Sequence, residues 1–545
     1  MLTHIRGGRI IDPAHGRDEL GDLWMRAGRI VAPPAGETLA DATHDADDMI
    51  VMAGAIDIHS HIAGANVNMA RLLLPEAHPR SKRRPAHTPL ATAGWSTFET
   101  GCAYATMGFT TVVEPAVAPH HALHAHLELA DIPIIDKALL SILGNDDYLL
   151  RLIRDKASAA NVSEYVSWTL NATRALGVKV VNAGGAAAFK ANVRTFSLDD
   201  VVPWYGVSSR DIVKALQRAV NDLGVPHPLH VHCNNLGLST GVDTVIATIE
   251  AAEGLPLHLA HIQFYAYGRE GDRHFSSAAA RLAESVNTHK NITVDVGQVM
   301  FGQTVTISCD VLRQFAAMGR ATPKKWVIFD GDSNGVGIVP YNYREDNFHN
   351  AVQWAAGLEL FLLIDDPARV FFTTDHPNGA PYTAYPDLFA LLMDRDLRAE
   401  WIARLPPAAI AMTTLPSIKR EYTLNDIATM TRAAPAKLLG LRDRGHLGVG
   451  AVADVALYAP GKDRAEMFRH AALVFKDGDL VVRDGRVAHY RWGRALNVGC
   501  EPDPAIERRM RDYYDEAYGL DSRFMKVSVN AIGRPNPFES VSCGR

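Results

Sequence analysis

Six residues of the types that ligate metal ions lie within or at the end of short apolar segments of this chain. Two of them, His59 and His61, are one residue apart at the end of an apolar run that begins at residue 49. In a strand, residues i and i+2 project to the same face, so both imidazoles can point at one cation. Neutral imidazole is a good zinc ligand. The other four candidates, in chain order, are Lys179, His232, His261 and Asp375.

Each candidate also has an ordinary explanation. A strand histidine is often a hydrogen-bonded core residue, an aspartate a cap, and a lysine a side chain that reaches to solvent. Six such residues in order along the relevant strands, with His59 and His61 on the same one, favour a shared metal site instead. Lys190 is the alternative to Lys179, but it lies beyond the strand and past two glycines. His230 lies deeper than the histidine that ends the same segment, so we prefer the later histidines to His230 and His258.

The elements that must position these residues are eight apolar segments separated by helical stretches. Eight βα units predict an α/β fold, a (β/α)8 TIM-type barrel, in which chemistry takes place at the carboxyl ends of the strands. All six candidates would then converge on one mouth. The expected strands are the segment that ends at His59 and residues 110–113, 132–135, 178–181, 229–232, 257–262, 292–296 and 370–375.

Both ends of the chain have the pattern of short strands separated by turn residues. We therefore expect a small β-sandwich domain built from residues 1–52 and 445–497, around a barrel of residues 53–444 with insertions near 62–107 and 298–345. Residues 498–545 form a C-terminal tail with a charged segment at 506–514. This tail either docks a partner protein or packs on its own barrel, and the sequence leaves both interpretations open.

Composition excludes several classes of function. The 545 residues are 47% hydrophobic, which is enough for a substantial core. Their formal net charge of −6 gives no global attraction to nucleic acid or to an anionic membrane. The five cysteines form no CxxC pair, so neither a disulfide framework nor an iron–sulfur site is expected. The N-terminus lacks a signal-peptide pattern, and no apolar run is long enough to span a bilayer. We expect a cytoplasmic protein without nucleic acid or membrane partners.

The order and spacing of the six candidates resemble the amidohydrolase superfamily. Residues 431–441 and 445–450 look like the ending of dihydropyrimidinase-like enzymes, whereas Ala53 stands where the family commonly has proline. The resemblance implies two zinc ions bridged by an N6-carboxylated Lys179, with Asp375 as both ligand and catalytic proton acceptor. A free lysine amine, with a reference pKa of about 10.4, would present a cation to two dications. Reaction with CO2 turns that amine into an anionic carbamate. The implied zinc ligands are His59, His61, Lys179, His232, His261 and Asp375.

Four further segments, 178–185, 232–237, 260–268 and 329–335, look like the A subunit of formylmethanofuran dehydrogenase and the related alpha subunit of the formyltransferase/hydrolase complex of methylotrophic bacteria. The alanine- and arginine-rich composition favours the bacterial complex. The resemblance implies hydrolysis of the N-formyl amide of a methanofuran-type C1 carrier, such as formylmethanofuran or formylmethylofuran, to formate and the free amine. It also implies partner subunits in one-carbon metabolism.

Three alternatives stay open. They are a hydantoinase or dihydropyrimidinase acting on a cyclic amide, the A subunit of a formylmethanofuran dehydrogenase working from formate towards the formamide, and a non-catalytic scaffold. The presence of all six candidate ligands argues against the scaffold.

Four residues are candidates for substrate binding. Asn235 follows the metal-ligand candidate His232, and His376 would lie at the mouth unless it is only a turn residue. Arg83 and Arg84 belong to the basic run 79–85, which could attract the acidic glutamyl tail of a methanofuran-type carrier or could be a solvated loop. The histidine-rich segment 120–126 is expected on the surface.

Overall fold

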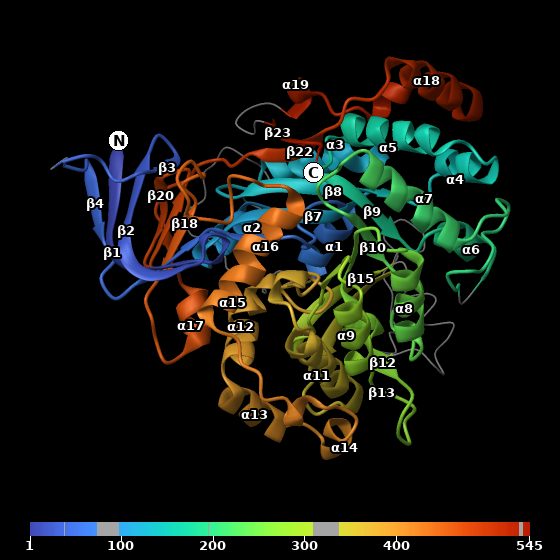
Figure 1. Ribbon diagram of the computed structural model, residues 1–545. Helices are drawn as coiled ribbons and strands as arrows, with labels where there is room; N and C mark the ends of the chain where they lie inside the picture. Colours follow the sequence, from blue (N-terminus) through green and yellow to red (C-terminus); the bar gives the residue numbers. More distant parts are fainter. Residues whose placement is uncertain (37–38, 74–96, 194–195, 309–336, 533–537, 545) are drawn as a thin grey trace.

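Eight parallel strands form the barrel in the computed structural model, which describes residues 1–36, 39–73, 97–193, 196–308, 337–532 and 538–544 (Figure 1). Neighbouring strands pair in parallel, and a parallel bridge between Ser60 and His376 closes the circle between the first and the last strand. The predicted TIM-type fold is therefore confirmed. The barrel strands are β6 (Ala55–Asp57), β7 (Phe109–Val117), β8 (Asp136–Leu143), β9 (Gly177–Val181), β10 (Leu229–His232), β11 (Leu257–Leu259), β14 (Ile292–Asp295) and β17 (Val370–Phe371).

Most helices cover the outside of this barrel and bury their apolar sides in one large core, whereas Ala70 of the first helix belongs to a smaller cluster with Val305 and Ile338. Several begin at a side-chain cap, such as the capping box of Ser208 and Asp211 that starts α7. The helices of this part of the chain are α1 (Ala65–Leu73), α2 (Thr97–Thr106), α3 (Ala122–Ala130), α4 (Asp147–Arg154), α5 (Ala159–Thr173), α6 (Gly185–Lys190), α7 (Ser209–Asp222), α8 (Gly241–Ala251), α9 (Ala279–Thr288), α11 (Phe348–Leu363), α12 (Tyr385–Met393), α13 (Arg395–Ala403), α14 (Pro407–Ile410), α15 (Leu424–Ala428) and α16 (Ala434–Leu439).

The expected strand at 132–135 is wrong, because the third barrel strand begins at Asp136. Pro133 has no N–H to donate, and Ile134 adopts a left-handed φ of 70°, which strands do not tolerate. The strands that carry His261 and Asp375 also end earlier than expected. Both residues have left-handed φ angles, 35° and 51°, so the ladder stops before each site residue.

Both ends of the chain build one small domain beside the barrel, as predicted. Its nine strands are hydrogen-bonded into a continuous sheet, in which β5 pairs with β18 at the seam between the two chain ends. Val51 and Leu457 meet in that seam and share a buried core with Leu23 and Phe475. The strands are β1 (Leu2–Asp12), β2 (Arg17–Arg26), β3 (Arg29–Val31), β4 (Ala42–Asp45), β5 (Ile50–Ala53), β18 (Val455–Tyr458), β19 (Leu473–Lys476), β20 (Asp479–Arg483) and β21 (Arg486–Val487).

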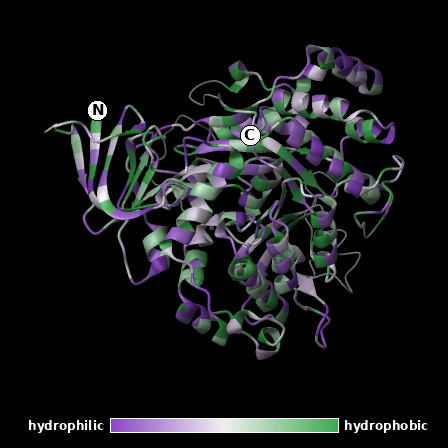
Figure 2. Ribbon diagram, viewed as in Figure 1, coloured by the Kyte–Doolittle hydropathy of each residue, from purple (hydrophilic) through white to green (hydrophobic). Residues whose placement is uncertain are grey.

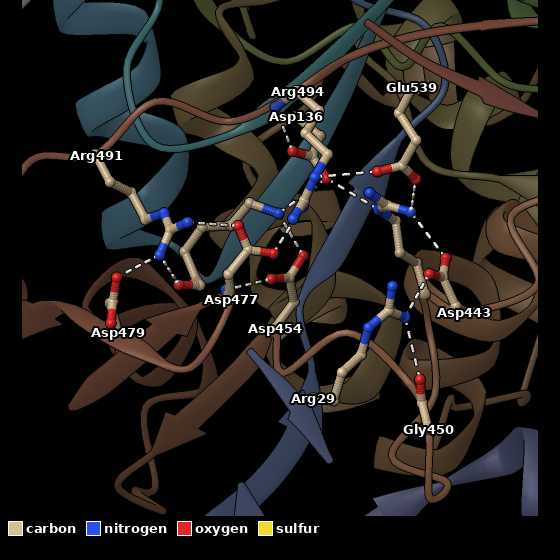
Figure 3. Close-up of polar contacts among 12 residues, drawn as sticks. Arg29, Asp136, Asp443, Gly450, Asp454, Asp477, Asp479, Arg491, Arg494 and Glu539 are labelled. Carbon is tan, nitrogen blue, oxygen red and sulfur yellow. Dashed lines mark hydrogen bonds and ion pairs between the residues drawn. The ribbon is translucent and has the colours of Figure 1, made fainter. Parts of the chain in front are cut away.

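A buried network of ion pairs joins the small domain to the barrel (Figure 3). Lys476, fully buried on β19, donates to Asp136 of the barrel at 2.9 Å and to Asp454 at 2.7 Å. Arg444 donates to the same Asp136 at 2.9 Å and to Glu539 near the C-terminus at 2.8 Å. The network therefore ties together the small domain, the barrel and the end of the chain.

The C-terminal tail packs on its own barrel. The strand β22 (Ala495–Gly499) pairs in parallel with β8, and β23 (Phe538–Ser542) pairs in parallel with β22. The helix α18 (Pro504–Tyr518), mostly hydrophilic in Figure 2, lies along α5, where Trp168 donates to Glu507 at 3.2 Å. Of the described helices, none combines the length and the apolar character that a membrane crossing requires.

Candidate metal centre

The structure brings five of the six candidate ligands together at the carboxyl ends of the barrel strands. Nε2 of His59 and Nε2 of His61 lie 3.1 Å and 3.4 Å from the same oxygen, Oδ1 of Asp375. The ring centroid of His261 lies 5.4 Å from that of His59 and 4.6 Å from that of His232. Four of the five residues are buried, and the side chain of His61 is 20% exposed. Such a cluster has the donor types and the access that a catalytic zinc site needs.

Lys179, the sixth candidate, is buried on β9. Burial lowers the pKa of its amine to about 8, although Asp295 and Asp375 oppose this shift. The lysine therefore lies within electrostatic reach of two carboxylates of the site. Lys190, its competitor in the sequence, is exposed at the end of α6.

Two buried carboxylates orient the histidines of the HxH pair from behind. Nδ1 of His59 lies 2.9 Å from Oδ2 of Asp295, and Nδ1 of His61 lies 3.0 Å from Oε1 of Glu114. A carboxylate accepts a hydrogen bond from Nδ1–H, so each ring keeps its proton on Nδ1 and presents the Nε2 lone pair. Both lone pairs then face Asp375. This is the arrangement of metal-ligating histidines held by an outer carboxylate.

A second histidine cluster lies below the first and shares His59 with it. Nε2 of His230 is 3.1 Å from Nδ1 of His59, and Nε2 of His258 is 3.0 Å from Oδ2 of Asp295. His59, His230 and Asp295 could by distance also hold an ion. However, Nδ1 of His59 donates to Asp295, so this ring has only Nε2 left for a metal. We therefore interpret the deeper cluster as a hydrogen-bonded support.

The backbone and neighbours of Asp375 hold its carboxylate in one orientation. Its N–H donates to Oγ1 of Thr373 at 2.7 Å, and Nδ2 of Asn378 donates to its Oδ2 at 2.9 Å. Burial alone would raise the pKa of Asp375, but His261, His59 and His61 hold it well below its usual range. The carboxylate is thus ionised, with Oδ1 turned towards the histidines.

The donor set fits a cation. Two buried atoms, Nδ1 of His261 and Oδ1 of Asp375, have no hydrogen-bond partner in the described part of the chain. Two imidazole lone pairs that face a carboxylate oxygen at 3.1 Å and 3.4 Å repel it unless positive charge lies between them. Burial lowers the pKa of His61, yet Glu114 and Asp375 raise it to about 9. The site therefore attracts positive charge, which a metal ion or a proton can supply.

Asn235 and His376 have contacts within the protein scaffold. Asn235 accepts the N–H of Phe196 at 3.1 Å through Oδ1. The carbonyl of His376 accepts the N–H of His61 at 2.9 Å, and its ring packs edge-on against Tyr382. Contact of either residue with substrate stays a prediction. Arg83 and Arg84 lie outside the described residues.

Sequence reasoning missed the two outer carboxylates. Both carry a signal like the one that identified the ligands, a polar residue next to an apolar strand segment: Asp295 is the last residue of β14, and Glu114 lies within β7 directly after Val112 and Val113. Neither has a spacing motif that links it to its histidine, because the partners are 53 and 236 residues apart in sequence.

Comparison with known proteins gives matches over the whole chain. Residues 42–489 match the Amidohydrolase family. The chain is 51% identical over 549 residues to the A subunit of the formyltransferase/hydrolase complex Fhc of Methylorubrum extorquens, with 100% of both chains covered. It is 37% identical over 525 residues to Protein FwdA of Methanocaldococcus jannaschii, with 91% of each covered.

Among solved structures, the chain matches the FhcABCD complex of Methylorubrum extorquens with methylofuran at a TM-score of 0.93 and 50% identity, with full coverage of both chains. A D-aminoacylase matches at 0.52 and 14% identity, with 90% of this chain and 99% of that one covered, which shows the fold alone.

Proposed function

Because this chain belongs to the amidohydrolase family and is a metal-dependent hydrolase, we propose that it cleaves the N-formyl amide of a methanofuran-type C1 carrier to formate and the free amine. It does so as the A subunit of a formyltransferase/hydrolase complex with several different subunits, in one-carbon metabolism. The observation that carries this proposal is the 51% identity to the A subunit of Fhc over the full length. The match to the structure of that complex with methylofuran supports the carrier class.

The proposed cofactor is a pair of zinc ions bridged by the carboxylated Lys179. The unpartnered Asp375 Oδ1 and His261 Nδ1, and the two imidazole lone pairs that face Asp375, support a cation at this point. The lowered pKa of Lys179, about 8, supports carboxylation, because only the neutral amine reacts with CO2. The six proposed ligands are His59, His61, Lys179, His232, His261 and Asp375.

The reaction requires that a water add to the formyl carbon and that a proton reach the amine. When bound, two zinc ions lower the pKa of a shared water and polarise the formyl oxygen. Asp375 accepts the proton of the attacking water and passes it to the departing nitrogen. Asn378 occupies one lone pair of Oδ2 and leaves the other free for this proton. Burial of the cluster keeps bulk water from these groups.

Asp375→Asn tests this role. The amide keeps an oxygen for the metal but is a far weaker proton acceptor, so turnover of N-formylfurfurylamine should be lost while zinc content is mostly retained. Asp365→Asn, at an exposed aspartate near the end of α11, is the matched control and should change neither quantity. Loss of both zinc ions together with activity would assign Asp375 a mainly structural role.

Substrate choice separates this proposal from the cyclic-amide alternative. The formyl hydrolase should cleave N-formylfurfurylamine and leave dihydrouracil intact, whereas a dihydropyrimidinase would do the reverse. The opposite direction, from formate to the formamide, is the second candidate, because the segments at 178–185 and 232–237 also resemble the A subunit of formylmethanofuran dehydrogenase. Incorporation of labelled formate into the carrier amine would favour that direction.

Substitutions in the basic run 79–85 test whether this segment recognises an acidic tail of the carrier. If Arg83 and Arg84 bind it, alanine at both positions should raise KM for the natural carrier at low salt and have less effect at high salt, because salt screens exposed charges. KM for N-formylfurfurylamine, which has no tail, should stay unchanged. An unchanged KM for the natural carrier at both salt concentrations would contradict the idea.

A further inference from the structure

The C-terminal segment adds two strands to the barrel sheet (Figure 1), and two cysteines lie next to each other just beyond the end of these strands. The strands β22 and β23 run parallel, and their last paired residues are Gly499 and Ser542. The next residues along the two strands are Cys500 and Cys543, and their thiols are in hydrogen-bonding contact. This contact joins two cysteines that are 43 positions apart in the chain, since 543 − 500 = 43.

The geometry suits a covalent bond between the two sulfurs. Neighbouring residues on paired strands have Cα atoms about 5 Å apart, within the range of about 4.4–6.8 Å that disulfides require. Both cysteines are free thiols in this structure. Because the strand register already aligns them, oxidation needs little backbone movement.

The two thiols differ in access. Cys500 is 4% exposed and belongs to the main hydrophobic core, whereas Cys543 is half-buried at the edge of that core. Their contact lowers the pKa of Cys543, which favours its thiolate, and it raises the pKa of Cys500. An oxidant therefore meets Cys543 first, and Cys500 is placed to react second.

We propose that Cys500 and Cys543 form a reversible disulfide that fastens the C-terminal strand to the barrel, with a peroxide as oxidant. The thiolate of Cys543 attacks a peroxide oxygen, the O–O bond breaks, and a sulfenic acid and hydroxide form. The thiol of Cys500 then attacks that sulfur, the S–O bond breaks, and the second oxygen leaves as water. Overall, two thiols and one hydrogen peroxide give one disulfide and two waters. The proposal does not depend on the reaction at the metal site.

The strand that this bond would fasten carries contacts to several parts of the molecule. Glu539 of β23 pairs with Arg444 and Arg494 in the buried network (Figure 3), and Arg174 lies over the ring of Phe538. A cross-link at the end of β23 prevents β22 and β23 from separating at that end, so this local unfolding step is blocked. The disulfide would therefore slow local unfolding of this joint.

Treatment of the full-length protein with equimolar hydrogen peroxide, followed by alkylation under denaturing conditions, tests the bond itself. Free thiols should fall from five to three per chain, and peptide mapping should find the cross-link between residues 500 and 543, which dithiothreitol reverses. Cys102→Ser, at a half-buried cysteine on α2, is the matched control and should keep the cross-link. An unchanged thiol count, or a cross-link between other cysteines, would overturn the proposal.

Single variants test the order of events. Cys500→Ser should stop at a sulfenic acid on residue 543 that dimedone traps, whereas Cys543→Ser should leave Cys500 unmodified. Oxidation of Cys500 in the second variant would refute the assigned order.

Hydrogen exchange tests whether the disulfide holds the C-terminal strand in place. Amides of residues 538–542 should exchange at least about tenfold more slowly after oxidation of the native chain. Equal exchange rates before and after disulfide formation would refute the fastening role.

Discussion

Lys179 should react with CO2 far more readily than an ordinary lysine once metal is removed from the protein. Only the neutral amine attacks CO2, and burial lowers the pKa of Lys179 from 10.5 to about 8. At pH 7 about one amine in ten is then neutral, compared with roughly one in 2,500 for a lysine with a pKa of about 10.4. At pH 7 the neutral, reactive fraction of Lys179 should therefore be about 200-fold larger than that of an ordinary lysine.

The initial rate of carbamate formation measures this advantage. Chelator-treated protein is mixed with 13C-labelled CO2 at a fixed dissolved concentration, and the carbamate signal is followed between pH 6 and pH 10. Because the folded-state pKa is depressed, the neutral amine grows about tenfold per pH unit below 8 and levels off above it. Lys179→Met should abolish the fast signal, and Lys190→Met, at the exposed lysine of α6, should leave it unchanged.

A rate that continues to rise up to pH 10 would refute the reasoning, because it would show an amine with an ordinary pKa. Metal reconstitution gives a second, independent check. In CO2-free buffer the apoprotein should regain little zinc and little activity, and addition of bicarbonate should restore both. Full reconstitution without CO2 would show that the lysine reaches the metal centre uncarboxylated.

Three further changes test the supporting structure. Asp295→Asn should weaken zinc binding about 10–100-fold in a chelator competition without unfolding the chain, because it removes the anion that orients one imidazole; unchanged affinity would contradict that role. Lys476→Met leaves the buried Asp454 without its ion-pair partner and leaves Asp136 with Arg444 alone, so it should lower the free energy of unfolding by about 3–5 kcal/mol in urea, whereas Arg6→Met, at an exposed ion pair, should leave the midpoint unchanged. Gly54→Ala would place a methyl group 2.1 Å from Oγ1 of Thr110 and should cost about 1–3 kcal/mol; a normal unfolding midpoint would contradict this.

The barrel and the convergence of five candidate ligands could be predicted from sequence because both rest on local patterns. An apolar strand that ends in His232, or that is followed within two residues by His59, predicts both the strand and its place at the mouth of the barrel from a few residues. The strand boundaries were less predictable. At 132–135 the apolar pattern is genuine, and all four residues are buried, but Pro133 and the left-handed Ile134 break the ladder. Burial and strand pairing are separate properties, and hydrophobicity reports only the first.

The position of the tail could not be predicted for a different reason. Its helix has polar residues on most positions, and its contacts to the barrel, such as Trp168 with Glu507, join residues 339 positions apart. Nothing within the segment distinguishes a face that packs on its own barrel from a face that docks a partner. Packing on the barrel leaves the tail residues Leu520, Phe524 and Val529 exposed.

The position of His59 explains why the depth of a side chain in the barrel, and not its residue type, decides whether that side chain can serve as a ligand. His59 lies between two clusters that contain the same kinds of donors. Its Nδ1 proton is committed to Asp295, a fully buried anion whose pKa its histidine neighbours lower despite burial. Only Nε2 can therefore ligate, and it points to the mouth, where His61 and Asp375 lie. If Asp295→Asn left that ring free to rotate, metal could shift towards the deeper cluster. A crystal structure of this variant with zinc would locate the ion, and zinc at its expected place beside Asp375 with full affinity would refute the role assigned to the buried anion.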